Sequence, residues 1–224
     1  MGLLEQIRGG LIASCQPVDD GPMDHPHIVA AMAQAAIAGG AVGLRIEGIE
    51  NLRAVRPLVD VPIIGIVKTT LPDTAVNITV TVADALALAA AGADVIAYDA
   101  TPRQRPDARE DVFDAIRSQG CLAMADCATL DDGRAALATG ASILGTTLSG
   151  YTRDTEGKHE GPDFELIEAF HDLGGFVMAE GRINTPELAA RALAAGADSV
   201  TVGSALTRLE HVTGWFAAAL RDVR

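Results

Sequence analysis

The chain has 224 residues, of which 49% are hydrophobic, and its 17 Lys and Arg against 30 Asp and Glu give a net charge of −13. A chain of this length buries about 70–75% of its unfolded surface on folding, which suits one domain over residues 1–224 without a disulfide or metal staple. The negative charge repels phosphate backbones and anionic membrane surfaces, so it argues against nucleic acid and membranes as partners.

The three cysteines, Cys15, Cys121 and Cys127, show no metal-ligand spacing, and each lies in or beside an apolar run. We interpret them as buried, reduced thiols of a cytoplasmic protein. Residues 11–15 superficially resemble a lipoprotein processing site but lack the cationic start of one. No charge-free apolar stretch reaches about 20 residues, so we expect no membrane span.

An internal repeat runs along the chain. Four Ala-rich helical segments each end at a Gly-Ala stop, and a short apolar run follows. Glycine is common just past a helix C-terminus, where the backbone turns left-handed. The apolar runs are too short for helices and rich in β-branched residues, which predicts buried strands. The stop glycines lie 52, 48 and 56 residues apart, at Gly40, Gly92, Gly140 and Gly196.

Four further strands are predicted midway between these, over residues 10–15, 62–68, 121–126 and 175–181. Together the two sets give eight strands, each about 26 residues from the next, with one helix between neighbours. Eight such units predict a (β/α)8 TIM barrel. A doubly wound open sheet is the alternative, but it rarely carries eight evenly spaced units. The polar residues that close the second set are spaced by 52, 58 and 54 positions, at Gln16, Lys68, Asp126 and Glu180.

Capping residues mark several helix starts. Thr129 precedes two aspartates, and Thr185 precedes Pro186 at the first helical position. In the last helical stretch, Trp215, Phe216 and Leu220 recur at core spacing. This pattern predicts packing in the outer layer of the barrel or a contact between two copies, so a homodimer is one predicted assembly.

Two loops interrupt the even spacing, residues 17–27 after the first strand and residues 150–162 after the sixth. Both fall on the C-terminal face of the predicted barrel, where such folds hold their active sites. We weigh residues 150–162 equally as a substrate lid and as an ordinary surface loop. His25 and His27 lie in an acidic stretch, but no helix or strand would fix them as ligands, so we predict no metal site.

Polar side chains close the predicted strands and should converge on one mouth of the barrel. Charged residues are seldom buried without a partner or a purpose, and taken together this set indicates an active site. For any single member a structural ion pair is about as plausible as catalysis. In chain order the set is Gln16, Arg45, Glu47, Lys68, Asp99, Asp126, Thr146, Thr147, Glu180, Arg182, Gly203 and Ser204.

Lys68 and Glu180 each close an apolar run and are the predicted acid–base pair. A desolvated lysine has a lowered pKa, which makes its neutral amine available as a base or a Schiff-base nucleophile. The third and seventh strands lie across a barrel from each other, so the two groups could approach one carbon from different sides. That arrangement suits removal and return of a proton beside a carbonyl. A salt bridge is the structural alternative.

Loops after the seventh and eighth strands of such barrels commonly bind phosphate through backbone N–H groups. Glycines there allow close backbone approach, and arginines supply forked cationic donors. The alternative is surface arginines beside a capping glycine. The predicted phosphate-binding residues are Gly181, Arg182, Gly203, Ser204 and Arg208.

Eight strings in order between about residues 10 and 216 carry a family resemblance: GLIASCQP, GGAVGLRIEG, VPIIGIVK, AGADVIAYDAT, AMADCAT, GTTLSGYT, MAEGRINTPE and VTVGSALTR. They resemble the N-acetylmannosamine-6-phosphate 2-epimerase family. The resemblance implies an enzyme that interconverts N-acetylmannosamine 6-phosphate and N-acetylglucosamine 6-phosphate in sialic-acid catabolism. It also implies an amino-sugar phosphate as the small-molecule partner, with no metal or organic cofactor.

The resemblance further implies residue roles. Lys68 corresponds to the acid/base that exchanges the C2 proton, and Glu180 to a group that assists proton transfer or ring opening. Gln16, Arg45 and Asp126 would orient the sugar hydroxyls and the N-acetyl group, while the five loop residues named above would hold the phosphate. The sequence departs from the family at Thr69 and Thr70, where a charged pair is usual, and at Val80, where proline is usual.

Two other functions stay open at this point. A Schiff-base aldolase or lyase acting on a sugar phosphate is compatible with Lys68, and would leave an adduct that borohydride traps. A non-catalytic phosphosugar-binding barrel would bind the ligand without exchanging its C2 proton. The combination of Lys68, Glu180 and Asp126 argues against such a loss of chemistry.

Overall fold

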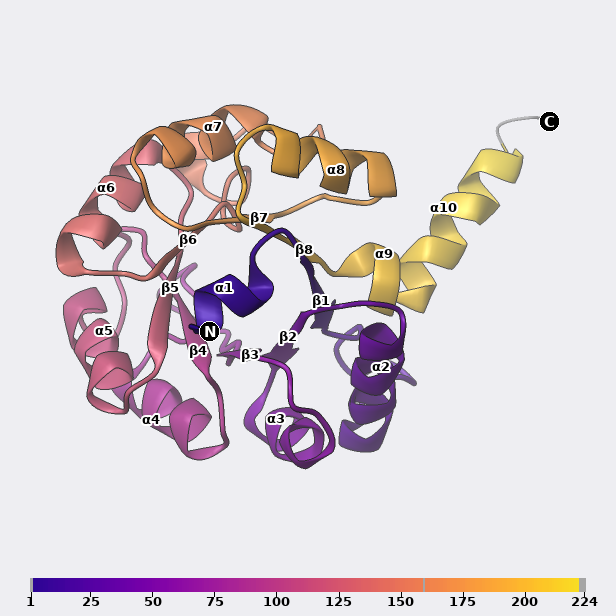
Figure 1. Cartoon of the computed structure of the whole chain (residues 1–224), viewed down its shortest axis with the longest axis horizontal. Coiled ribbons are helices and arrows are strands. Elements are labelled where there is room, and N and C mark those ends of the chain that lie inside the picture. The colour runs from indigo at the N-terminus through magenta and orange to yellow at the C-terminus, as the bar shows by residue number, and fades with distance from the viewer. Residues whose placement is uncertain (1, 159, 222–224) are drawn as a thin grey trace.

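In the computed structural model, which describes residues 2–158 and 160–221, the strands close into a parallel barrel in chain order (Figure 1). The predicted (β/α)8 fold is confirmed. Met1, His159 and residues 222–224, which the predicted domain also includes, lie outside the described residues. The strands are β1 (Leu11–Cys15), β2 (Gly43–Glu47), β3 (Ile63–Ile66), β4 (Val95–Asp99), β5 (Leu122–Asp126), β6 (Ile143–Gly145), β7 (Val177–Glu180) and β8 (Ser199–Val202).

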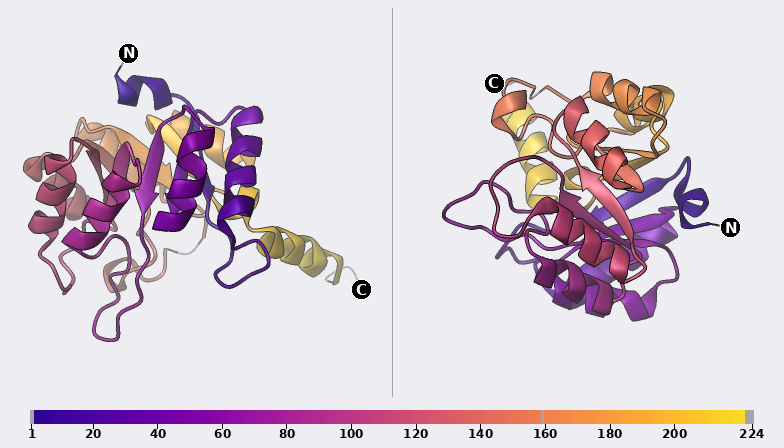
Figure 2. Two further views of the ribbon diagram at one scale, coloured as in Figure 1. Left: turned by 90° about the horizontal axis from the view of Figure 1, so that it is seen from below. Right: turned by 90° about the vertical axis from the view of Figure 1, so that its left-hand side faces the viewer.

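Helices surround the barrel, and α1 lies across its N-terminal end, opposite the long loops (Figure 2). Within the described residues, no helix is long and apolar enough to cross a bilayer. The α-helices are α1 (Leu3–Ile7), α2 (Pro26–Ala38), α3 (Ile49–Val55), α4 (Val82–Ala90), α5 (Arg109–Ser118), α6 (Leu130–Thr139), α7 (Phe164–Asp172), α8 (Pro186–Ala194), α9 (Ser204–Thr207) and α10 (Leu209–Arg221), with short 3-10 turns at Arg56–Leu58 and Arg153–Thr155.

The predicted helix boundaries rest on local hydrogen bonds. The Thr129 side chain accepts from the Asp132 N–H, while the Asp132 carboxylate accepts from the Thr129 N–H, so α6 begins with a complete capping box. Thr185 accepts from the Leu188 N–H at the start of α8. The predicted stop glycines all have left-handed φ values; that of Gly140 is 103°. Caps and stops therefore fix the repeating unit locally.

Alternation along the strands divides the core into two layers. Outward-facing residues such as Leu44 and Ile96 pack beneath the helices, whereas inward-facing residues such as Ile64 and Met124 fill the barrel. Toward the C-terminal ends the inward positions become polar. Because side chains repeat with period two, this polar layer lies directly above the apolar plug and opens toward the C-terminal loops.

The last helix departs from its predicted packing. Figure 1 shows α10 projecting from the barrel beside α2 instead of lying along the outer layer. No α10 residue is buried, and Phe216 and Leu220 are 70% and 73% exposed. The predicted outer-layer packing is therefore wrong. The spacing of the apolar residues in α10 predicted that one face of the helix packs against the barrel. The short α9 instead changes the direction of the chain before α10 begins.

We predict that Thr129→Ala lowers the free energy of unfolding by about 1 kcal/mol, because the variant loses the capping box of α6. Urea unfolding followed by circular dichroism measures the change. Thr70→Ala, at an exposed loop position, is the control and should leave the midpoint unchanged. Equal midpoints for Thr129→Ala and the unchanged protein would contradict the assigned cap.

Candidate active site

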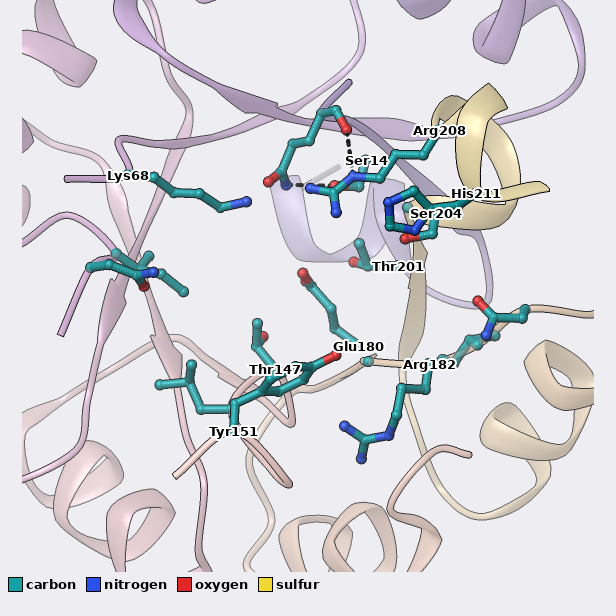
Figure 3. Close-up of a pocket in the computed structure, with 18 of the residues that line it drawn as sticks. Ser14, Lys68, Thr147, Tyr151, Glu180, Arg182, Thr201, Ser204, Arg208 and His211 are labelled. Carbon is teal, nitrogen blue, oxygen red and sulfur yellow. Dashed lines mark hydrogen bonds between the residues drawn. The ribbon is translucent and has the colours of Figure 1, made fainter. Parts of the chain in front are cut away.

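A cavity of about 590 Å³ opens at the C-terminal mouth of the barrel, a size typical of small-molecule sites (Figure 3). It contains most of the predicted site residues. Figure 3 shows the Lys68 amine and the Glu180 carboxyl group entering from different sides, with Arg208 and Ser204 on a third side. The predicted residues that line it are Gln16, Lys68, Glu180, Gly181, Arg182, Gly203, Ser204 and Arg208.

The other two predicted residues, Arg45 and Asp126, lie beneath the cavity. Arg45 is 1% exposed and Asp126 is fully buried. One terminal nitrogen of Arg45 lies 2.6 Å from Asp126 Oδ2, and the other lies 3.1 Å from Glu180 Oε2. Thr147 donates a 2.6 Å hydrogen bond to Asp126 Oδ1. This buried cluster supports the reactive groups from below, and Arg45 contacts Glu180 directly.

Close packing is required around the Asp126 carboxylate. A side chain at Gly145 would place its Cβ 2.6 Å from Met124 Cε and 3.0 Å from Asp126 Oδ1. A side chain here would therefore crowd the Asp126 carboxylate and displace the end of the Met124 side chain. The glycine that ends β6 is thus part of the construction of the site.

Burial raises the pKa of the Glu180 carboxyl group to about 7. The Arg45 cation opposes this shift, whereas the neighbouring Asp126 carboxylate adds to it. A carboxyl group with a pKa near neutrality can both hold and release a proton under physiological conditions. Glu180 is therefore suited to acid–base chemistry.

Lys68 is exposed to the open cavity, and the protein around its amine still removes part of its hydration. This desolvation lowers the pKa of Lys68, and the nearby cations Arg208 and Arg45 lower it further. Glu47 and Asp19 oppose the shift. The direction predicted from the sequence is confirmed: a larger fraction of the amine is neutral than for a free lysine.

The backbone holds Lys68 in place on two sides. Glu47 Oε1 accepts a 3.3 Å hydrogen bond from the Lys68 N–H, and Lys68 forms an antiparallel bridge with Ile78 on the returning arm of the loop. Beside Ile78, Thr79 is buried at a φ of 44°, a strained conformation for a β-branched residue. The returning arm of the loop is therefore held by its pairing with Val67 and Lys68, which follow β3.

The family departures fall on this same loop. Thr69 donates its N–H to the Asn77 carbonyl, Thr70 is exposed, and Val80 is buried. None of the three lines the cavity, whereas Asn77 and Ile78 do. The departures therefore bear on the cavity through the course of the loop that carries Asn77 and Ile78.

Phosphate-binding groups gather on one side of the cavity. Within the described residues, the amide N–H groups of Gly203 and Ser204 meet no acceptor. Arg208 donates through Nε to the Gln16 carbonyl at 3.0 Å, which orients the guanidinium beside the cavity. Gln16 in turn donates through its side chain to Ser14. Free amides beside an anchored arginine are suited to an oxyanion.

Arg182 lines the cavity but is engaged with the loop of residues 150–162. It donates to the Gly161 carbonyl at 2.7 Å and to the Ser149 carbonyl at 2.8 Å, and its guanidinium lies 5.3 Å from the centre of the Tyr151 ring. Figure 3 shows this guanidinium on the side away from Arg208 and Ser204. Its contacts fit a role in holding the loop; its predicted contact with phosphate stays a prediction.

The predicted lid contributes one cavity residue, Tyr151, which is 62% exposed. Lys158 forms an ion pair with Asp163 at the far end of the loop. His159, within the predicted segment, lies outside the described residues. The lid function itself stays a prediction.

The sequence interpretation missed several cavity residues. Thr201 could have been found from the period-two alternation of β8, and His211 and Trp215 from their i+3 and i+7 spacing to Arg208. Asn77 and Tyr151 carry no such signal because loop conformation alone brings them in. Among the missed residues are Ser14, Asn77, Ile78, Thr201, His211 and Trp215, while Tyr151 was predicted only as part of the loop of residues 150–162.

Asp99, one of the predicted strand-end carboxylates, forms structural ion pairs. Asp99 is fully buried. Its carboxylate oxygens lie 2.5 Å from a terminal guanidinium nitrogen of Arg103 and 3.1 Å from one of Arg105. The described part of the chain contains no group of three or more His, Cys, Asp or Glu side chains placed to hold a metal ion. His25 and His27 stack on each other with ring centres 5.7 Å apart.

Comparison with known proteins identifies the family. Residues 29–222 match the family described as "Putative N-acetylmannosamine-6-phosphate epimerase" (NanE). The chain belongs to the NanE family. It is 60% identical, over 96% of its length and 91% of the relative's, to the "Putative N-acetylmannosamine-6-phosphate 2-epimerase" of Photobacterium profundum. The protein of the same name from Pasteurella multocida is 57% identical over 99% of this chain and 96% of that one.

A solved structure shows that the NanE resemblance extends through the whole fold. The N-acetylmannosamine-6-phosphate 2-epimerase from Clostridium perfringens superposes with a TM-score of 0.94 at 38% identity, covering 98% of this chain and 96% of that one. The chain is thus an enzyme of an epimerase family built on the (β/α)8 barrel.

The raised pKa of Glu180 makes a prediction about stability. The folded state holds this proton more tightly than the unfolded state, in which a glutamate titrates near 4.5. The stabilisation from the bound proton is fully present below about pH 4.5 and is lost as pH rises through about 7. Glu180→Gln, which cannot ionise, should therefore become more stable relative to the unchanged protein by roughly 1–3 kcal/mol between pH 5 and pH 8.

Urea unfolding of both proteins at the two pH values measures this difference. Glu165→Gln, on the surface helix α7, is the control and should show no comparable pH dependence. A difference between Glu180→Gln and the unchanged protein that stays constant with pH would contradict the shifted pKa.

Proposed function

We propose that the chain interconverts N-acetylmannosamine 6-phosphate and N-acetylglucosamine 6-phosphate by removing and returning the proton at C2. The observation that carries the proposal is the placement of Lys68 and Glu180 on different sides of one cavity, each with a pKa shifted toward neutrality. The family membership supplies the substrate. The reaction would serve the breakdown of sialic acid, as the family resemblance implies.

The proposed chemistry starts from the open-chain sugar. Its C2 hydrogen is acidified by the adjacent aldehyde, and the neutral Lys68 amine takes this proton. The electron pair of the C–H bond moves toward the carbonyl oxygen and gives an enolate. Return of a proton to the opposite face inverts C2, and Glu180 is placed to assist this transfer or the opening of the ring.

Binding of the phosphate, which is remote from C2, would hold the open-chain sugar with its C2 carbon beside Lys68 and Glu180. The free amides of Gly203 and Ser204 and the guanidinium of Arg208 offer donors for it on one side of the cavity. Contacts far from the reacting carbon fix the position of the substrate on binding, so less entropy is lost on reaching the transition state. Gln16, beside Arg208, is placed for a sugar hydroxyl. Arg45 and Asp126 would act from below through Glu180 and Thr147.

We predict that Lys68→Ala slows turnover by at least about 100-fold, because proton transfer by a positioned side chain contributes this much or more. Proton NMR of purified protein with N-acetylmannosamine 6-phosphate measures turnover. The chain has one other lysine, so Lys158→Ala is a matched control and should retain turnover. Binding of the sugar phosphate to Lys68→Ala, measured by calorimetry, should persist.

Turnover of Lys68→Ala at the unchanged rate would contradict the proposal. Borohydride treatment in the presence of substrate separates the lyase alternative, because a Schiff base at Lys68 would leave a reduced adduct detectable by mass spectrometry. Binding without any turnover by the unchanged protein would favour the non-catalytic barrel.

We also propose that the chain forms a homodimer through α10. The helix exposes Leu209, Phe216 and Leu220. An apolar groove lined by residues including Leu11, Leu193 and Leu206 lies open beside α8, β1 and β8. A second copy would cover both surfaces with matching apolar area.

Light scattering after size-exclusion chromatography tests the assembly. The unchanged protein should have the mass of two chains, and Phe216→Asp should shift it toward the mass of one, because the charge would be buried without a partner. Thr213→Asp, at an exposed polar position of α10, is the control. A single-chain mass for the unchanged protein at micromolar concentration would contradict the proposal.

A further inference from the structure

Unpartnered buried polar atoms gather at one place in the described part of the chain. They are Arg45 Nε, Glu180 Oε2 and Thr201 Oγ1. Glu180 Oε2 lies 3.1 Å from an Arg45 nitrogen, an ionic contact without the alignment of a hydrogen bond. Buried polar groups without partners are rare because each is costly. Their location on the floor of the cavity indicates that they serve the site.

Thr201 is placed beside Glu180 by the barrel itself. It pairs with Glu180 in the parallel register of β7 and β8, so both side chains point into the barrel. Thr201 is 2% exposed and lines the cavity with Glu180. Its hydroxyl can donate one hydrogen bond, and the open position on the Glu180 carboxyl group is an acceptor on the neighbouring strand.

Two other hydroxyl groups in or near the barrel form hydrogen bonds within the protein. Ser199, two residues earlier on β8, donates a 2.9 Å hydrogen bond to the Gly10 carbonyl at the other end of the barrel. Thr147, two residues after the end of β6, donates to Asp126. Thr201 occupies the corresponding place beside Glu180, and its hydroxyl has no structural bond that would otherwise account for it.

We propose that Thr201 is a positioning residue for Glu180: its hydroxyl donates to the carboxyl group and holds it in the orientation that meets the substrate. The proposal rests on the proposed function, in which Glu180 takes part in proton transfer. It deepens that function by naming the group on the neighbouring strand β8 that fixes the rotamer of Glu180.

The charges around Glu180 set the expected pH behaviour. Arg45 from β2 and Lys68 from β3 lower the pKa of Glu180, whereas Asp126 from β5 raises it. The adjacent Thr201 hydroxyl also lowers the pKa of Glu180, because a donor beside a carboxylate favours its charged form. Loss of this hydroxyl should therefore raise the pKa of Glu180.

The test compares Thr201→Val, which keeps the branched shape without the hydroxyl, with Thr201→Ser, which keeps the hydroxyl. Rates of epimerisation of N-acetylmannosamine 6-phosphate are measured from pH 5 to pH 9. Thr201→Val should lower kcat about tenfold with little change in KM. In the plot of kcat against pH, the inflection that reports the ionisation of Glu180 should also move to a higher pH by roughly one unit. Thr201→Ser should restore both.

Two controls exclude a structural explanation. Ser199→Ala removes a hydroxyl from the same strand away from the cavity and should keep the kcat and the pH profile. Thermal melting of Thr201→Val should be nearly unchanged, since within the described residues the hydroxyl has no partner other than the proposed one, the Glu180 carboxyl group. In a Glu180→Gln background, Thr201→Val should slow the reaction no further, because the two residues act as one unit.

Several results would overturn the proposal. These are an unchanged rate and profile in Thr201→Val, a higher KM at unchanged kcat, a Thr201→Ser variant as slow as Thr201→Val, or additive effects with Glu180→Gln. If Thr201→Val does not fold, Thr201→Ala serves the same comparison. Failure of the proposed function is distinct, because the unchanged protein would then leave the substrate unconverted at every pH.

Discussion

The buried guanidinium of Arg45 is the constraint on which the site depends. It lies inside the barrel, 1% exposed, between the carboxyl groups of Asp126 and Glu180. Without this cation, two carboxylates would share a poorly hydrated space, and their mutual repulsion would oppose folding. The alternating pattern of the parallel strands places all three on one inward layer. The fold therefore brings the three charged groups together, and burial in this layer raises the pKa of the Glu180 carboxyl group to about 7 against the opposing effect of Arg45.

Much of the fold and part of the site could be predicted because the signals are local. The regular spacing of the stop glycines and of the polar strand ends indicates eight repeated strand–helix units. Eight such units predict the (β/α)8 barrel. Lys68 and Glu180 could be placed in one cavity because the C-terminal ends of parallel strands converge on one mouth. The direction of the Lys68 pKa shift followed from the apolar run before it.

What the sequence could not place depends on tertiary contacts. The apolar spacing of Phe216 and Leu220 does not say which surface they meet, and α10 leaves the barrel instead of covering it. The hydrogen bonds from Arg182 to the Ser149 and Gly161 carbonyls depend on how the loop folds back, so the sequence pattern could not show them. Tyr151 reaches the cavity from a loop whose sequence has no helical or strand periodicity. Burial of Arg45 and Asp126 beneath the cavity depends on side chains packed around them from several strands, which no local pattern shows.

The most direct measurement of the central claim is proton NMR of N-acetylmannosamine 6-phosphate with the unchanged protein in D2O. Removal and return of the C2 proton within one cavity predicts that the C2 proton signal disappears as the gluco epimer forms, since deuterium from solvent replaces it. EDTA in the sample tests whether this exchange persists without free metal ions, as expected for Lys68 and Glu180 chemistry. Conversion with the C2 proton fully retained, or no conversion of bound substrate, would contradict the account.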